Sequence, residues 1–205
     1  MNLIVISELF PPEETSTAYI MGEITKTLSD KYNVTIVCGP EVYDQNKLTV
    51  LPKSSLIAGV TTIRVKGIKE NKANKLSRIR KFLLMSWRLY KASKKVINKG
   101  DKVLLVSNPF PLLILMAFHR KKMDYEISFL AHDLFPEPLL MRFKLPNLVY
   151  RQCLNIFNRS YARMDKIISL GRDMTDVLRE KTMPYNPNLE IIQIENWGDI
   201  NSIYP

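Results

Sequence analysis

His132 and Asp133 are adjacent and directly follow an apolar run that ends at Ala131. An imidazole titrates near neutral pH and can donate a hydrogen bond to a substrate hydroxyl, while a neighbouring carboxylate can orient the ring or accept a proton. We therefore predict that this pair is catalytic. A purely structural role, in which both residues cap the loop that leads to Pro136, stays open.

A second group of candidates carries hydroxyl or guanidinium groups next to predicted helix starts. Hydroxyls, free amides at a helix start and an arginine are groups that hold phosphates and polar substrates. We predict substrate binding by Thr15, Ser16, Thr17, Ser169 and Arg172. Two alternatives remain: Thr15 or Ser16 acts only as an N-cap, and Arg172 is a solvated charge at a helix start.

The elements that must position these residues are short apolar, β-branched segments alternating with longer amphipathic ones. The predicted strands are Leu3 to Ser7, Asn33 to Cys38, Thr61 to Val65, Lys102 to Ser107, Glu126 to Ala131, Lys166 to Leu170 and Glu190 to Ile194. The predicted helices are Ser16 to Lys31, Lys75 to Asn98, Leu112 to Lys121, Leu145 to Arg163 and Arg172 to Glu180. This alternation predicts an α/β fold: a Rossmann-like, doubly wound, mostly parallel sheet with helices on both faces.

Ligands of such sheets bind beyond the carboxyl ends of the strands. The segments that follow the strands are Glu8 to Thr17, Gly39-Pro40, Asn108 to Pro111, His132 to Glu137 and Gly171 to Asp173. All the candidate site residues fall in these segments or beside them. We therefore expect them to gather along one edge of the sheet.

Several function classes are disfavoured by what the sequence lacks. The first loop has no glycines for a dinucleotide pyrophosphate, and GxxxxGK[ST] does not occur, which argues against a dehydrogenase or a P-loop NTPase. The 2 cysteines and 2 histidines are scattered, so we expect no structural zinc site and a reducing compartment. We also expect no bound cofactor. The apolar run from Val103 to Phe118 is too short and too rich in proline to span a membrane.

Composition indicates one ordinary globular domain, since 46% of the 205 residues are hydrophobic and 24% are charged. The first residues lead directly into a strand without a secretory leader, so we expect a cytoplasmic protein.

The net charge of +10 is concentrated between Glu70 and Asp101, where ten lysines and arginines occur without an acid. On a helix, Phe82, Met85, Leu89, Ala92 and Val96 form one apolar stripe that should face the sheet. We predict that an anionic membrane surface contacts Arg80, Lys81, Leu84, Trp87, Arg88, Lys91 and Lys95. A solvated amphipathic helix is the alternative. Nucleic acid is not an expected partner, because no nucleic-acid-binding motif accompanies the charge.

Five motifs occur in a characteristic order: Phe10-Pro11-Pro12-Glu13, Val34 to Val37, His132 to Glu137, Ile167-Ile168-Ser169 with Met174, and Asn196-Trp197-Gly198-Asp199. Through them the whole chain resembles the N-terminal domain of a family 4 retaining glycosyltransferase of GT-B architecture. It is most similar to bacterial enzymes of capsular or exopolysaccharide synthesis. One departure is clear, because the family usually carries a glycine pair where this chain has Thr15 to Ala18.

The resemblance implies a Rossmann-like, acceptor-side domain over residues 1–198 and the start of an interdomain linker at 199–205, with the donor-binding domain absent. It implies sugar transfer from a nucleotide-sugar, with retained configuration and no required metal. The implied acceptor is a saccharide on polyprenyl diphosphate, which would place the protein peripherally on the inner face of the cell membrane. We expect the fragment alone to be inactive. Two alternatives are an accessory subunit that pairs with a separate donor-binding chain and a nucleotide-binding module of unrelated chemistry.

Overall fold

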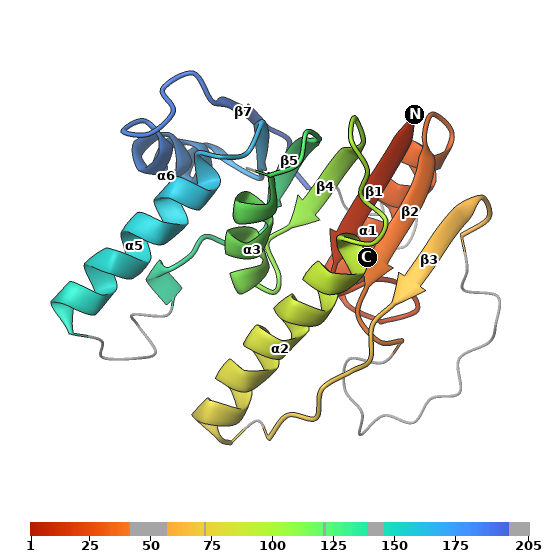
Figure 1. Cartoon of the computed structure of the whole chain (residues 1–205), viewed down its shortest axis with the longest axis horizontal. Helices are drawn as coiled ribbons and strands as arrows, with labels where there is room; N and C mark the ends of the chain where they lie inside the picture. The colour runs from red at the N-terminus through yellow and green to blue at the C-terminus, as the bar shows by residue number, and fades with distance from the viewer. Residues whose placement is uncertain (42–56, 72, 121, 139–145, 197–205) are drawn as a thin grey trace, which may run out of the picture.

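The computed structural model describes residues 1–41, 57–71, 73–120, 122–138 and 146–196. Its centre is a seven-stranded sheet in the order β3-β2-β1-β4-β5-β6-β7, in which every neighbouring pair is parallel (Figure 1). The strands are β1 (Asn2–Ser7), β2 (Asn33–Cys38), β3 (Val60–Arg64), β4 (Lys102–Val106), β5 (Glu126–Ala131), β6 (Lys166–Ser169) and β7 (Glu190–Gln193). The strand order reverses direction between β1 and β4, which makes this pair the topological switch point of a doubly wound sheet.

The helices connect the strands by crossovers. They are α1 (Ser16–Ser29), α2 (Lys75–Ser93), α3 (Pro111–Arg120), α5 (Asn147–Tyr161) and α6 (Arg172–Thr182). All seven predicted strands and all five predicted helices are confirmed, with differences at their ends. The largest difference is in α2, which was predicted to reach Asn98. It ends five residues earlier, at Ser93, because the chain turns after that residue. In the segment that follows, the Asn98 amide donates to the Asp101 carboxylate at 2.7 Å.

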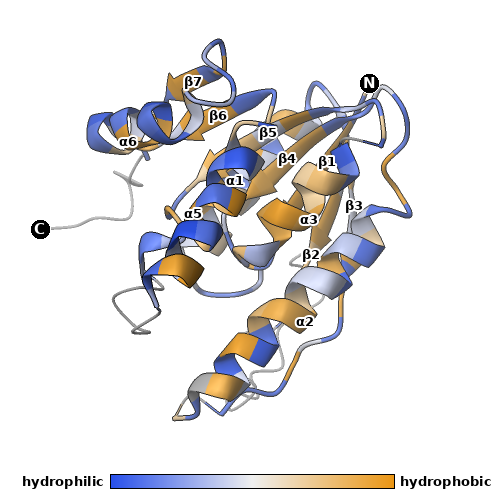
Figure 2. Cartoon of the chain, turned by 60° about the vertical axis from the view of Figure 1, so that its left-hand side comes forward, coloured by the Kyte–Doolittle hydropathy of each residue, from blue (hydrophilic) through white to orange (hydrophobic). Residues whose placement is uncertain are grey.

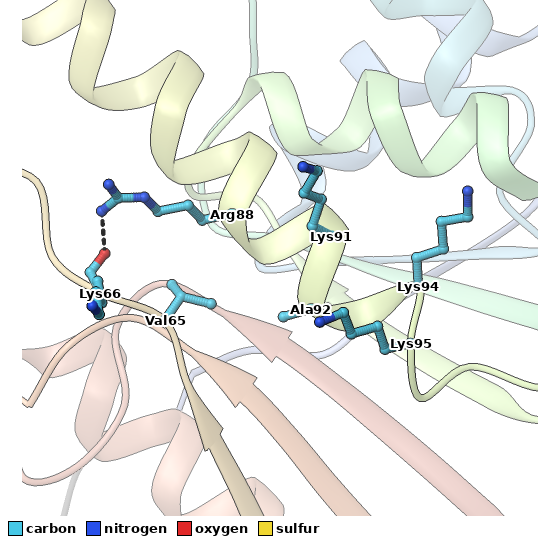
Figure 3. A pocket seen from close by; sticks show the side chains of 7 residues that line it. All are labelled: Val65, Lys66, Arg88, Lys91, Ala92, Lys94 and Lys95. Atoms are coloured by element: carbon cyan, nitrogen blue, oxygen red, sulfur yellow. Dashed lines mark hydrogen bonds between the residues drawn. The ribbon is translucent and has the colours of Figure 1, made fainter.

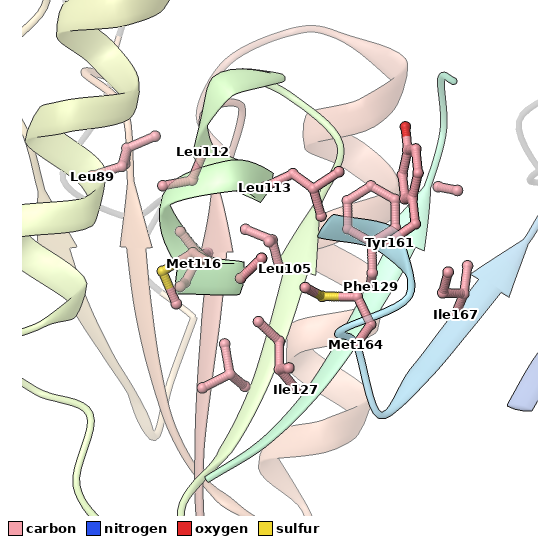
Figure 4. Close-up of a cluster of buried hydrophobic side chains, with 14 of the residues drawn as sticks. Leu89, Leu105, Leu112, Leu113, Met116, Ile127, Phe129, Tyr161, Met164 and Ile167 are labelled. Atoms are coloured by element: carbon pink, nitrogen blue, oxygen red, sulfur yellow. The ribbon is translucent and has the colours of Figure 1, made fainter. Parts of the chain in front are cut away.

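Each strand contributes alternate side chains to two cores, as the two-residue period of a strand requires. Ile4 and Ile6 of β1 belong to the larger core, which α2, α3, α5 and α6 cover. Figure 4 shows part of this core, with Leu89 of α2, Leu112 of α3 and Tyr161 of α5 among its side chains. Leu3 and Val5 belong to the second core, which α1 covers. Helices on both faces are therefore confirmed, but they are distributed unevenly.

The face that α1 covers has a hollow of about 490 Å³ beside that helix. Aliphatic side chains from α1 and from β4 to β6 line it, among them Ile24, Leu104, Leu130 and Ile168, and Asn196 also lines it. On the other face, the larger core extends under α2, α3, α5 and α6.

The two edges of the sheet differ in character. At the amino edge, the first residues of neighbouring strands form ion pairs, Lys102 with Glu126 and Lys166 with Glu190. At the carboxyl edge lie the loops that hold the predicted site residues, and the first turns of α2 extend beyond that edge (Figure 1). The apolar run from Val103 to Phe118 is divided between β4 and α3, and among the described helices none has the length and apolarity to cross a membrane.

Candidate functional site

The loops at the carboxyl edge are joined to one another by backbone hydrogen bonds. The Gly39 amide after β2 donates to the Glu8 carbonyl oxygen after β1 at 3.0 Å. The Glu8 amide donates in turn to the carbonyl oxygen of Asn108, after β4, at 3.4 Å. The predicted gathering of strand ends is therefore observed, and Glu8 lies at its centre, at the switch point between β1 and β4.

The loop after β5 is fixed by the end of β4. The buried hydroxyl of Ser107 accepts hydrogen bonds from the amides of His132 at 3.3 Å and Asp133 at 3.2 Å. The side-chain amide of Asn108 donates to the Asp133 carboxylate at 3.2 Å. Both predicted catalytic residues are thus held in place by residues that sequence reasoning did not select.

The rest of this loop is anchored to the helices. The Tyr161 hydroxyl, at the end of α5, accepts from the Phe135 amide at 3.0 Å and donates to the Phe135 carbonyl oxygen at 3.3 Å. The Phe135 ring stacks on Phe110 with 4.6 Å between centroids. Glu137 forms an ion pair with the buried Lys181 of α6. These contacts give the loop an ordered position from which it can present His132 to a ligand.

His132 is half-buried, and the loss of solvation lowers its pKa although the Asp133 carboxylate opposes this effect. The ring is therefore neutral at pH 7, so one ring nitrogen carries a proton and the other accepts. Its buried Nε2 atom has no hydrogen-bond partner among the described residues. Asp133 is exposed, and its carboxylate accepts a hydrogen bond from the side-chain amide of Asn108. Groups of a ligand can therefore reach this carboxylate.

Thr15 is the N-cap of α1, and its hydroxyl accepts from the Ala18 amide at 3.2 Å. The capping role, which was the alternative to ligand contact, is therefore present. Ser16 is exposed and Thr17 is half-buried at the first turn of the same helix. Arg172 is exposed at the start of α6, where the N-cap Gly171 offers no side chain to the helix amides.

The prediction that Ser169 contacts substrate is wrong. Its side chain is completely buried, and its hydroxyl shares a hydrogen bond of 2.5 Å with the Thr175 hydroxyl. The Ser169 hydroxyl also donates to the Ile192 carbonyl oxygen at 3.4 Å. Ser169 therefore joins β6 to α6 and β7, and its position at a strand end does not give it access to a ligand.

The prediction that Lys81 lies on the membrane-facing surface is also wrong. The residue is 4% exposed, and its ammonium donates to Glu70 at 3.1 Å and lies 4.0 Å from the Glu8 carboxylate. Lys81 precedes Met85 and Leu89 by four and eight residues, which places it on the buried face of α2. That spacing was the signal that could have identified it.

Glu8 was not selected from the sequence, although it immediately follows β1. It is 4% exposed, and burial raises the pKa of its carboxyl to about 7. Lys81 lowers this pKa, while Glu70 raises it. A buried, titratable carboxyl at the edge where ligands bind is a feature of functional sites.

The other predicted membrane contacts lie on or near the surface of α2. Arg80, Lys91 and Lys95 are exposed, as are Leu84 at 41% and Trp87 at 46%. Leu76 at 75% and Leu83 at 55%, which were not predicted, add to the apolar surface of this helix. Figure 2 shows hydrophobic and hydrophilic segments alternating along the ribbon of α2. The predicted sheet-facing stripe is confirmed in Met85 and Leu89, which are fully buried.

Arg88 points toward the connection between β3 and α2, where its guanidinium donates to the carbonyl oxygen of Lys66 at 2.7 Å (Figure 3). It also donates to the carbonyl oxygen of Gly67 at 2.9 Å. It lines an open hollow of about 670 Å³ together with Val65, Lys66, Lys91, Ala92, Lys94 and Lys95. Neither this hollow nor the one beside α1 includes His132. Among the described residues, no three His, Cys, Asp or Glu side chains are grouped to hold a metal ion.

No protein-family model matches the chain. The whole chain is 24% identical over 209 residues to WbjE of Pseudomonas aeruginosa, which is named a probable glycosyltransferase, and covers 49% of it. The sequence is thus similar to a glycosyltransferase, and it spans about half the length of that relative.

Solved structures share the fold. The N-terminal domain of Candida albicans trehalose-6-phosphate phosphatase matches 95% of the chain and 48% of its own with a TM-score of 0.64 and 11% identity. Anabaena Alr3699/HepE in complex with UDP matches 98% of the chain and 45% of its own with a TM-score of 0.53 and 11% identity. A Burkholderia xenovorans trehalose-phosphate synthase in complex with glucose-6-phosphate matches 89% of the chain and 43% of its own length, with a TM-score of 0.53 and 11% identity. The parallel α/β sheet is therefore the Rossmann-like fold found in one half of GT-B glycosyltransferases.

Proposed function

We propose that the chain is the acceptor-side half of a family 4 retaining glycosyltransferase, which transfers a sugar from a nucleotide-sugar to an acceptor hydroxyl. The observation that carries the proposal is the loop at the carboxyl edge, which holds a neutral His132 beside the exposed Asp133. The buried Nε2 of His132 has no hydrogen-bond partner in the part of the chain that the structure describes. The similarity to a probable glycosyltransferase and to the UDP-bound Anabaena protein supports a sugar-nucleotide substrate.

In this role, His132 donates or accepts a hydrogen bond at a hydroxyl of the donor sugar, because its neutral ring offers one of each. Asp133 accepts the proton that the acceptor hydroxyl releases, since its carboxylate is exposed and held by Asn108. The departing diphosphate requires electrostatic stabilisation. We assign that task to a donor-binding domain, either in the same polypeptide or in a partner chain, so the described half alone would be inactive.

We further propose that the acceptor is a saccharide linked to polyprenyl diphosphate and that the enzyme acts in cell-surface polysaccharide synthesis at the inner face of the cell membrane. The surface of α2 supports a peripheral membrane contact, because exposed Leu84 and Trp87 lie among the exposed Arg80, Lys91 and Lys95. Basic charge combined with protruding apolar side chains is the pattern that binds anionic lipid surfaces. Lys81 is excluded from this surface.

An accessory role remains as a second candidate, in which this chain binds the acceptor and a separate chain binds the donor. The purified protein would then show no transfer until the partner chain is added.

The substitution His132→Ala in the full-length enzyme tests the proposal. Turnover should fall by about a hundredfold, because removing a group that acts in proton transfer or transition-state hydrogen bonding has an effect of this size. The matched control is Gln152→Ala on the exposed surface of α5, which should leave turnover unchanged. Unchanged turnover in His132→Ala would remove His132 from the site.

A further inference from the structure

We propose that Glu8 and Lys81 form a proton-linked latch between the sheet and α2, and that Glu8 is a positioning residue for the loops that carry His132 and Asp133. The catalytic consequence of the latch rests on the proposed function. Its existence does not, because it depends on contacts within this chain alone.

The backbone of Glu8 links three of the strand-end loops. Its carbonyl oxygen accepts from Gly39, and its amide donates to Asn108, whose side chain holds the Asp133 carboxylate. A displacement of Glu8 would therefore pass to Asp133 through two hydrogen bonds. Gly39 lies so close to Glu8 that no side chain fits at this position, because a Cβ atom there would lie 2.4 Å from the Glu8 carbonyl oxygen.

The Glu8 side chain is incompletely satisfied. Its buried Oε1 accepts no hydrogen bond from any described residue, and the Lys81 ammonium of α2 lies 4.0 Å away. Lys81 is shared with Glu70, to which it donates at 3.1 Å. The ammonium thus has one carboxylate at hydrogen-bond distance and a second just outside it.

Other polar and charged groups near Glu8 belong to the neighbouring elements. Arg64 of β3 donates to the carbonyl oxygens of Pro11 and Gly39, and it forms a 3.9 Å ion pair with Glu41. Burial raises the pKa of the Cys38 thiol of β2 to about 11, so this thiol stays neutral. Asp133 is engaged with Asn108. Among the described charged groups, Lys81 and Glu70 are therefore the ones that respond to the charge on Glu8.

The raised pKa of Glu8, about 7, means that its charge changes in the neutral range. Above that pH the carboxylate attracts Lys81, and a hydrogen bond between them can form by a small movement. Below it the neutral carboxyl releases Lys81 to Glu70. Because α2 carries Lys81 and its first turns extend beyond the carboxyl edge (Figure 1), the two states place this helix differently beside the site.

The latch predicts opposite effects on stability and activity. A carboxyl whose pKa is raised on folding contributes stability below its unfolded value of 4.5, and this stability is lost as the pH rises through about 7. The substitution Glu8→Gln keeps the neutral form at every pH, so it should raise the Tm at pH 8. The same change removes the closed latch and should lower kcat. If Glu8 and Lys81 formed only a structural ion pair, removal of the carboxylate would lower both the Tm and kcat.

The experiment compares wild type, Glu8→Gln and the exposed control Glu180→Gln of α6 between pH 6 and pH 8.5. In the wild-type enzyme, kcat should rise with an apparent pKa near that of Glu8. In Glu8→Gln, kcat should be about fivefold lower at pH 8 and equal to wild type at pH 6, with the acceptor KM within about twofold, because small misplacements act on the transition state. The control should follow the wild-type profile. A Glu8→Gln profile that matches wild type would overturn the positioning role.

Carbon NMR of the glutamate carboxyls in the intact protein tests the latch without any assay of sugar transfer. The signal lost in Glu8→Gln identifies Glu8, and it should titrate near pH 7. Lys81→Met should move this titration to higher pH, whereas Lys26→Met, at an exposed position on α1, should leave it unchanged. Titration of Glu8 near 4.5, or no response to Lys81→Met, would overturn the latch. A wild-type enzyme without transfer activity would contradict the proposed function and leave this titration as an independent result.

Discussion

The contact between Gly39 and Glu8 shows how a single residue limits the geometry of the carboxyl edge. The Gly39 amide donates to the Glu8 carbonyl oxygen, and the space for a side chain at Gly39 is filled by that same oxygen. The oxygen belongs to the backbone and cannot rotate away as a flexible side chain would. Glycine is therefore required here for close approach of two loops.

We predict that Gly39→Ala destabilises the protein by about 2 to 3 kcal/mol, because a methyl group forced into a filled space displaces backbone. Urea-induced unfolding monitored by circular dichroism measures this change. The control is Gly171→Ala, since a Cβ atom there meets nothing within 4 Å, and it should cost less than about 1 kcal/mol as an N-cap replacement. Equal effects of the two substitutions would contradict the steric explanation.

Residue-level predictions from the sequence succeeded where position along a strand decided the outcome. The strand end placed His132 and Asp133 correctly at the carboxyl edge, because the two-residue period and the length of β5 determine where that loop begins. Position did not reveal which way a side chain points. Ser169 turns inward to Thr175, and the buried carboxyl of Glu8 depends on a lysine more than seventy residues away, a pairing that no local pattern encodes.

At the scale of elements, the loop after β5 depends on α5 through one hydroxyl. Tyr161 is completely buried, and its hydroxyl bonds both the amide and the carbonyl oxygen of Phe135. Without that hydroxyl, two backbone groups of the loop lose their partner. The position of His132 therefore depends on a residue at the far end of a neighbouring helix.

We predict that Tyr161→Phe lowers the free energy of unfolding by about 1 to 3 kcal/mol, the usual cost of leaving buried polar groups unsatisfied. It should also lower the kcat of the full-length enzyme, because the loop that carries His132 is no longer fixed. The matched control is Tyr185→Phe, whose exposed hydroxyl bonds the Asn155 side chain at 2.7 Å, and both measurements should stay near wild type. A Tyr161→Phe enzyme with lower stability but unchanged kcat would show that the loop is fixed by its other contacts.

The elements themselves were predictable because their periodicities are local. Continuous β-branched runs produced the buried parallel strands, and the stripe with Met85 and Leu89 produced the buried face of α2. The end of α2 was not predictable in this way, because apolar residues continue the pattern to Val96 and Ile97 while the chain already turns at Lys94. The assignment of Lys81 failed because its charge was weighed above its spacing from Met85.

At the scale of the whole molecule, the net charge of +10 and the exposed surface of α2 determine how the protein meets other surfaces. Lys91 lies 5.3 Å above the Trp87 ring, so a cation and an aromatic side chain are presented together. Four apolar side chains of α2 are more than 40% exposed, Leu76, Leu83, Leu84 and Trp87. An amphipathic helix of this type can also stay solvated, and binding to vesicles distinguishes the two cases.

We predict that the protein sediments with vesicles of phosphatidylserine and phosphatidylcholine at low salt and is released as salt is raised, because each nearby cation contributes about 1 kcal/mol. Lys91→Ala with Lys95→Ala should weaken this binding by about tenfold or more on the same grounds. The control removes the same charge elsewhere, with Lys26→Ala and Lys31→Ala, both exposed, and should have a smaller effect. An absence of sedimentation at low salt, or sedimentation that salt does not change, would contradict a charge-driven membrane contact.

The fold class followed from the sequence as a whole, since alternation of strands and helices admits few topologies. The covering of the sheet did not follow, because which helix lies on which face depends on the direction of each crossover. The strand order reverses at β1 and β4, so among the helices of the described residues four share one face and α1 covers the other. The predicted linker at 199–205 lies outside the described residues.

Ion pairs join the first residues of β4 to β5 and of β6 to β7 at the amino edge. The charged side chains in these pairs neutralise one another within the sheet. If every residue were replaced in turn, the effects of the substitutions should therefore differ between the two edges of the sheet. Changes along the amino edge should register in melting temperature alone, whereas changes along the opposite margin should register in turnover and pH response. Such a map would show which margin of the sheet carries the functional site.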